Sequence, residues 1–232
     1  MSLYKNAFYW FLGLLALTLV GFWQSYFSKL DSVGHFTHHF HGIAMLLWVI
    51  LLIVQSWLIR NGERSRHRLF GKLSFAVAPA VLVSGVLVVF YSQGTAKEPL
   101  AAGAQSIMWF GLFSAGLYAF LYAMAIKHRK NMQLHARYMV ATALVFIVPG
   151  LSRTVFNYLA PLGIWVPTFY MLTWVPFLIG IWLMLQDWRN SRKFQPYFVF
   201  NCLWAINLFL WVWLPSQGWW NTFSAWVHEV AR

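Results

Sequence analysis

The sequence predicts an all-α fold, a polytopic membrane helical bundle of about seven transmembrane helices. Sixty per cent of the 232 residues are hydrophobic, only 9% are charged, and the mean hydropathy is +0.60. A soluble domain carries about 25% charged residues. So few charges cannot cover a water-facing surface, and we therefore expect the apolar side chains to face lipid. Aromatic residues reach 20%, which suits a chain that meets two membrane interfaces many times.

Seven apolar segments can cross a bilayer as helices, because a span needs about 20 apolar residues and irregular backbone cannot face lipid. These segments are 7–24, 42–59, 70–91, 106–126, 137–158, 167–186 and 196–214. Residues 1–214 thus form the expected transmembrane bundle. In residues 215–232 the apolar side chains fall on one helical face, which predicts an interfacial helix or tail on the outer face.

Basic residues set the expected orientation. The loops after the second, fourth and sixth segments are rich in Lys and Arg, whereas the other three hold only Lys29 and Lys97. Cytoplasmic loops carry this excess of positive charge. We therefore expect the N-terminus inside, the C-terminus outside, and a multi-pass protein of the inner (plasma) membrane.

The net charge of +12 is interpreted as this topology signal. A nucleic-acid partner is not expected, because phosphate binding needs a continuous basic surface on a soluble fold. The expected partners are the lipid bilayer and an electron-transfer or membrane-complex protein.

Four histidines cluster just before the second segment, on the expected outer side. They are His35, His38, His39 and His41. Residues three and four apart share a helix face, and a neutral imidazole donates a lone pair to metals. The cluster therefore predicts a site for a transition metal ion such as iron, copper or zinc. A polar interfacial loop that merely tolerates histidine is the alternative.

Two further histidines, His67 and His135, each open a segment on the expected inner side and are followed closely by Arg68 and Arg137. Two histidines from different helices can ligate one haem iron, with arginines pairing the haem propionates. These four residues are the candidate binding site for haem b. The alternative is that they only mark the cytoplasmic interface. The remaining two, His128 and His228, are expected to be exposed.

Arg153 lies near the outer end of the fifth segment and is a further candidate for cofactor binding. A charge inside a span is costly and usually faces the bundle interior, although an arginine can also snorkel to the headgroups. On one continuous helix it would share a face with His135. All five acids are expected outside the spans, which disfavours proton-coupled transport through a buried carboxylate.

Several short motifs occur in a fixed order along the chain. They are His39-Phe40-His41-Gly42, Gln55, His67-Arg68-Leu69-Phe70-Gly71, His135-Ala136-Arg137-Tyr138-Met139 and Arg153. In these the chain resembles a family of uncharacterised bacterial inner-membrane proteins, which implies membrane location but no activity. It is more distantly similar to cytochrome b561-type proteins, helical bundles that hold two b-haems between paired histidines. That likeness implies a haem between His67 and His135, but the crowded outer histidines depart from it.

The leading hypothesis is a redox-associated membrane protein that binds haem or a transition metal through histidines at helix ends, chiefly His39, His41, His67 and His135. The alternatives are a non-redox transporter or assembly subunit and, from the His-x-x-His-His string, a metal-dependent membrane hydroxylase. Whether the protein is an enzyme is left open.

Overall fold

The computed structural model describes residues 6–32, 35–164 and 168–232, and these residues form helices and turns with no strand. The α-helices are α2 (Ala7–Trp23), α3 (Phe36–Arg60), α4 (Arg64–Gly71), α5 (Ser74–Gly94), α6 (Ala102–Lys127), α7 (Met132–Leu144), α8 (Ile147–Thr154), α9 (Phe169–Leu172), α10 (Trp174–Arg189), α11 (Gln195–Trp213) and α12 (Gly218–Val230). Short 3₁₀ turns lie at Phe27–Lys29, Ala160–Leu162 and Leu214–Ser216, and a π-helical turn at Val155–Leu159. The all-α prediction is confirmed.

Within the described residues, six helical stretches are long and apolar enough to cross a membrane. They are Phe36–Arg60, Ser74–Gly94, Ala102–Lys127, Met132–Leu162, Phe169–Arg189 and Gln195–Ser216. Many of their large apolar side chains point outward, for example Ile43, Phe120 and Phe209. Water would not tolerate so much exposed apolar surface. The chain is therefore a multi-pass membrane protein whose helices face lipid.

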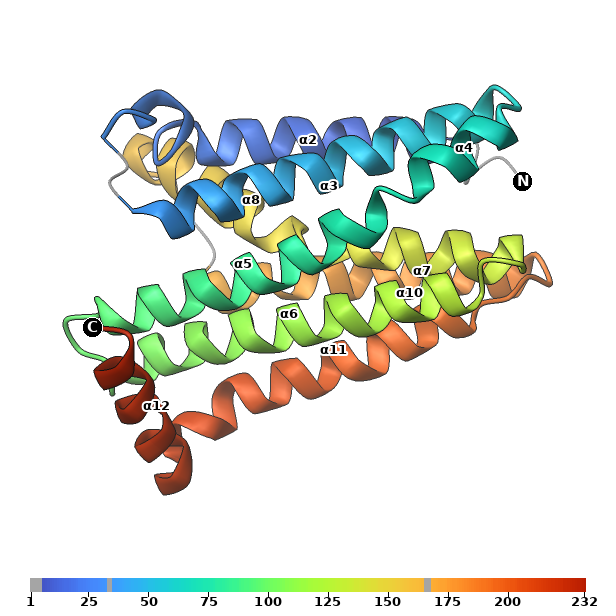
Figure 1. Cartoon of the computed structure of the whole chain (residues 1–232). Coiled ribbons are helices and arrows are strands. Elements are labelled where there is room, and N and C mark those ends of the chain that lie inside the picture. The colour runs from blue at the N-terminus through green and yellow to red at the C-terminus, as the bar shows by residue number, and fades with distance from the viewer. Residues whose placement is uncertain (1–5, 33–34, 165–167) are drawn as a thin grey trace.

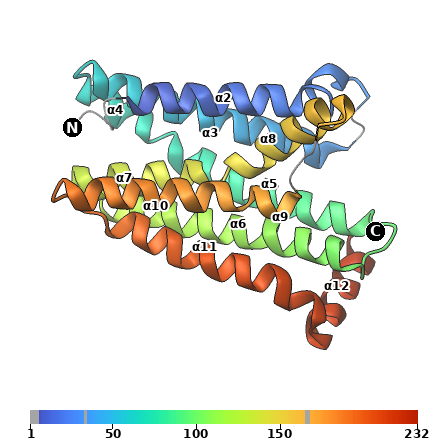
Figure 2. The ribbon, with the colours of Figure 1, turned by 180° about the vertical axis from the view of Figure 1, so that it is seen from behind.

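The helices form two groups joined by α5 (Figures 1 and 2). In one group α2 packs against α3 and α8, and in the other α6, α7, α10 and α11 pack together. Helix α5 contacts both α3 and α6. One core surrounds Trp48 and Leu52 and extends to Tyr118 of α6, and a second surrounds Leu121, Phe200 and Trp204.

The bundle has two distinct ends, and the chain termini lie at opposite ends (Figure 1). We call one the basic end, because its loops 61–63, 128–131 and 190–194 adjoin most of the basic residues. We call the other the tail end. It contains the start of α3, the turn 95–101 between α5 and α6, and α12.

The expected fifth span is interrupted in the middle. Helix α7 ends at Leu144, and α8 begins at Ile147 in the other helix group (Figure 1). Pro149 lacks the N–H that would bond to the carbonyl of Val145, which accounts for a break at this point. The inference that His135 and Arg153 share one face of a continuous helix is therefore wrong.

Helix α12 packs across the tail end of the bundle. The side chain of Gln93 donates to Ser224 Oγ at 2.7 Å, and Gln105 donates to Asn221 Oδ1 at 2.6 Å. His228 Nδ1 lies 2.8 Å from the carbonyl oxygen of Gln93, so the expectation that His228 is exposed is wrong. The face of α12 that contains Trp219 and Trp226 stays exposed.

Candidate functional site at the basic end

His135, at the start of α7, has a hydrogen bond that fixes the position of its Nδ1 proton. Its Nδ1 lies 2.9 Å from the carbonyl oxygen of Ala125, in the last turn of α6. Carbonyl groups in a last helical turn lack a partner within their helix, so this one is available. A carbonyl can only accept, and Nδ1 must therefore carry the proton. The lone pair of the imidazole is then on Nε2, the arrangement that second-shell hydrogen bonds impose on metal-bound histidines.

His67, in the short helix α4, is positioned by Gln55 of α3. The side-chain amide of Gln55, 9% exposed, lies between His67 and Gly71. With its oxygen toward Gly71 it accepts from that backbone N–H at 3.0 Å, and its NH₂ group donates to the carbonyl oxygen and Nδ1 of His67. A 180° turn of the amide would place its oxygen against Nδ1 instead. The tautomer of His67 is thus coupled to the orientation of Gln55.

Burial lowers the pKa of His67 below its usual value, and the nearby His135 acts in the same direction. His67 is consequently neutral at neutral pH. Only a neutral imidazole has a lone pair for a metal.

The structure brings His67 and His135 together from two different helix groups. Their ring centroids are 6.3 Å apart, and the ring planes are nearly perpendicular, at 86°. In sequence the two residues are far apart, so only the packing of α4 beside the α6–α7 turn creates this pair. This is the juxtaposition that the sequence predicted for the inner histidines.

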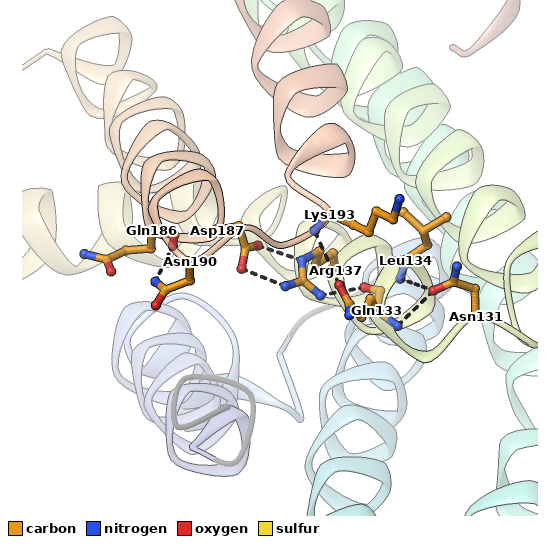
Figure 3. A network of polar contacts seen from close by, with 8 residues as sticks. All are labelled: Asn131, Gln133, Leu134, Arg137, Gln186, Asp187, Asn190 and Lys193. Carbon is orange, nitrogen blue, oxygen red and sulfur yellow. Dashed lines mark hydrogen bonds and ion pairs between the residues drawn. The ribbon is translucent and has the colours of Figure 1, made fainter.

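The two arginines that follow these histidines differ in surroundings. Arg68 is exposed beside His67. Arg137 is 2% exposed and donates through Nε to Asp187 Oδ2 at 2.6 Å and through Nη2 to Oδ1 at 2.7 Å, with Nη1 donating to the carbonyl oxygen of Gln133 (Figure 3). Arg137 thus forms an ion pair with a carboxylate of the protein and does not fit the predicted role of binding haem propionates.

Asp187 is the residue at this end that the sequence reasoning missed. It lies in α10, within the candidate span Phe169–Arg189, and is 1% exposed. The expectation that all five acids lie outside the spans is therefore wrong for Asp187. The expected sixth segment ended at residue 186, one position too early to include it.

His128 is also more enclosed than expected. It is partly buried, and its ring lies parallel to that of Tyr138, with centroids 5.8 Å apart. The expectation that His128 is exposed is therefore wrong, because its ring packs on α7 at the α6–α7 turn.

Among the four histidines at the tail end, His35 and His38 share Tyr91, whereas His39 and His41 have other partners. His35 is exposed and stacks on Tyr91, with ring centroids 4.0 Å apart. His38 meets the same ring edge-on at 5.0 Å. His39 Nδ1 lies 3.2 Å from the hydroxyl of Tyr26, and His41 Nδ1 lies 3.2 Å from Ser84 Oγ.

The described residues contain no group of three or more His, Cys, Asp or Glu side chains that could hold a metal ion. The tail-end histidines therefore do not converge on one point in this structure. His35, His38 and His41 contact α5, whereas His39 contacts the α2–α3 connection.

Arg153, in α8, also lies at the tail end. Its guanidinium carbon is 4.3 Å from the centroid of the Phe22 ring, and its Nη1 donates to the carbonyl oxygen of Pro149 at 3.2 Å. It is thus at the opposite end of the bundle from the His67–His135 pair. The candidate residues divide into two separate sites.

Comparison of the chain with protein-family models, with curated proteins and with solved structures found no significant match.

Proposed function

We propose that this protein is a redox-associated protein of the inner membrane that binds a b-type haem or a transition metal ion through His67 and His135. The observation that carries the proposal is the close approach of His67 and His135. Two imidazoles from separate helix groups lie 6.3 Å apart between centroids, and His135 has its lone pair fixed on Nε2.

Two histidines on separate helices would hold the group, and their ring centroids are 6.3 Å apart. A b-type haem held by such histidines would supply one-electron redox chemistry.

The neighbouring side chains fit such a group in part. Gln55 orients His67, and Ala125 orients His135, as outer partners of ligating histidines do. Arg68 remains available to pair with a carboxylate of the cofactor, whereas Arg137 does not. The proposal therefore rests on the histidines and uses one arginine.

The proposed topology has seven spans. Helix α2, with 17 apolar residues, runs beside α3 and α8 and would be the first. An odd number of spans agrees with termini at opposite ends (Figure 1). The basic end faces the cytoplasm in this proposal, because exposed Lys and Arg residues gather there. The His67–His135 site would then lie near the cytoplasmic interface.

The first test is the absorption spectrum and metal content of the protein purified in detergent without chelator. We expect stoichiometric iron with a b-type haem spectrum, or stoichiometric copper or zinc. His67→Ala and His135→Ala should each remove it. His128→Ala is the matched control at the same end and should retain it.

Absence of any stoichiometric metal or haem would contradict the proposal, as would metal content that is the same in all three variants. A non-redox role as a transporter or assembly subunit would then be the better explanation. One purified sample of each variant gives both the absorption spectrum and the metal content.

A further inference from the structure

Helix α4, which contains His67, has no buried residue. Hydrophobic packing therefore holds this helix only weakly, because little of its apolar surface is removed from the solvent. The proposed site nevertheless needs His67 at a set distance from His135. Polar contacts at Gly71, the last residue of α4, supply the missing restraint. One of them is the contact with Gln55 of α3 described above, and the other leads to α5 and α6.

The second contact is a chain of two hydrogen bonds. Ser74 Oγ lies 2.6 Å from the carbonyl oxygen of Gly71 and 2.9 Å from the hydroxyl of Tyr122, and Ser74 is 5% exposed. A carbonyl can only accept, so Ser74 donates to Gly71 and the Tyr122 hydroxyl donates to Ser74. Carbonyl groups in a last helical turn lack a partner within their helix. Tyr122 of α6 thus holds the end of α4 through Ser74.

The Tyr122 ring is itself fixed by the core. The fully buried indole of Trp48 meets it edge-on, with ring centroids 5.6 Å apart. The ring of Tyr118, one turn earlier on α6, lies nearly parallel to it at 6.5 Å. Rings packed in this way have little freedom to move, so the Tyr122 hydroxyl has a defined position. Tyr122 therefore ties α4 to the rigid part of the bundle.

Helix α6 holds both histidines of the pair. Ala125, whose carbonyl accepts from His135, lies three residues after Tyr122. Residues three apart are neighbours on a helix, and one turn spans about 5.4 Å. The same turn of α6 thus anchors His135 directly and α4, with His67, indirectly. The spacing of the two histidines consequently depends on the Tyr122 contact.

We propose that Tyr122 is a positioning residue, which acts through Ser74 to hold His67 at the distance from His135 that one bound haem iron or metal ion needs. This inference rests on the function proposed above for the two histidines. Gln55 orients the imidazole of His67, whereas Tyr122 sets the place of the helix that presents it. Loss of the Tyr122 hydroxyl should leave the fold intact and misplace one of the two ligands.

The test compares Tyr122→Phe with Tyr118→Phe, a matched control on the same helix. The Tyr118 hydroxyl is buried without a hydrogen-bond partner among the described residues, so its removal breaks no bond, whereas Tyr122→Phe breaks the bond to Ser74. Haemin and Co²⁺ are titrated separately into the full chain in detergent, after removal of bound metal and haem. Absorption and electron paramagnetic resonance report both the affinity and the ligands of the bound group.

Wild type and Tyr118→Phe should bind one of the two probes equally well and with the same spectrum. For Tyr122→Phe we expect about tenfold weaker affinity, the lower part of the range for outer partners of metal ligands. Its spectrum should also change, because one histidine is displaced. Ser74→Ala removes the same link from α5 and should match Tyr122→Phe, and it tests the proposal if Tyr122→Phe does not fold. Ser74→Thr keeps a hydroxyl and should restore binding.

A second readout needs no bound group. Hydrogen–deuterium exchange of the α4 amides should be faster in Tyr122→Phe and Ser74→Ala than in wild type and Tyr118→Phe, while exchange in α11 stays unchanged. Equal exchange in α4, or haemin or Co²⁺ binding by wild type that Tyr122→Phe retains in full, would overturn the positioning role alone. Failure of wild type to bind either probe would overturn the proposed function and this role together.

Discussion

Arg137 and Asp187 form a buried, bidentate ion pair that joins α7 to α10 at the basic end (Figure 3). Nε–Oδ2 and Nη2–Oδ1 are 2.6 and 2.7 Å apart, and both side chains are at most 3% exposed. Around the pair, Asn131 accepts from the N–H groups of Gln133 and Leu134, and thereby caps α7. The pair fixes the start of α7, from which His135 projects toward His67.

Breaking this pair should destabilise the protein strongly. Asp187→Asn leaves the buried guanidinium without a counter-charge, and we expect a loss of about 3–5 kcal/mol in the free energy of unfolding. Denaturant unfolding in detergent, followed by tryptophan fluorescence, measures it. Glu63→Gln removes the exposed pair with Arg66 and should change stability by less than about 1 kcal/mol. The double change Arg137→Met and Asp187→Leu should recover most of the loss, and failure to do so would show that the network around the pair matters more than its charges.

Close packing of α2 on α8 gives a second prediction. A Cβ atom on Gly21 would clash with the backbone carbonyl of Gly150, whereas one on Gly13 of the same helix would meet nothing within 4 Å. Gly21→Ala should therefore force the two helices apart and lower the unfolding free energy by about 1–3 kcal/mol. Gly13→Ala should be neutral or slightly stabilising, because alanine favours helix. Equal effects of the two changes on thermal unfolding would contradict the observed contact.

The sequence predicted the class of fold well, because apolar segments of span length admit only helices in lipid. It failed at the interruption between α7 and α8. A helix can continue past a proline with a kink, or it can end there. The packing of α8 on α2 determines that the helix is interrupted before Pro149.

The candidate sites were predictable in residue type but not in grouping. His67 and His135 were expected at the same end, and their rings lie close together there. The ion pair between Arg137 and Asp187 was not predicted, because it depends on which helix lies beside α7. The spread of the tail-end histidines likewise follows from tertiary contacts with Tyr26, Ser84 and Tyr91, which sequence spacing does not encode.

Gln55 should act as a positioning residue for the proposed haem or metal site. Gln55→Leu removes the amide that orients His67 and leaves Gly71 N–H without this acceptor. Outer partners of this kind are worth about 10–100-fold in metal affinity, so we expect the cofactor content to fall on dilution and the absorption bands to shift. Ser56→Ala is the control, because Ser56 donates only to its own helix, at the carbonyl of Ile53. Retention of wild-type affinity and spectrum in Gln55→Leu would remove Gln55 from the site.

Docking of α12 should depend on Gln93, whose side chain is 3% exposed and donates both to Ser224 Oγ and to the carbonyl of Pro99. Gln93→Ala removes both bonds, while Ser224 Oγ still donates to the carbonyl of Pro99 at 3.2 Å; we expect a loss of about 1–3 kcal/mol in this contact. The affected contact holds α12 to the end of α5, so the tail should detach before the bundle unfolds.

Limited chymotrypsin digestion detects this detachment, because α12 offers Trp219, Trp220, Phe223 and Trp226 as cleavage sites. We expect faster tail cleavage in Gln93→Ala, while Thr222→Ala, which loses only an exposed bond to the carbonyl of Gly218, should match wild type. An unchanged cleavage rate in Gln93→Ala would mean that Trp220 and Val227, buried against Met108 and Leu214, hold the tail without the polar contacts.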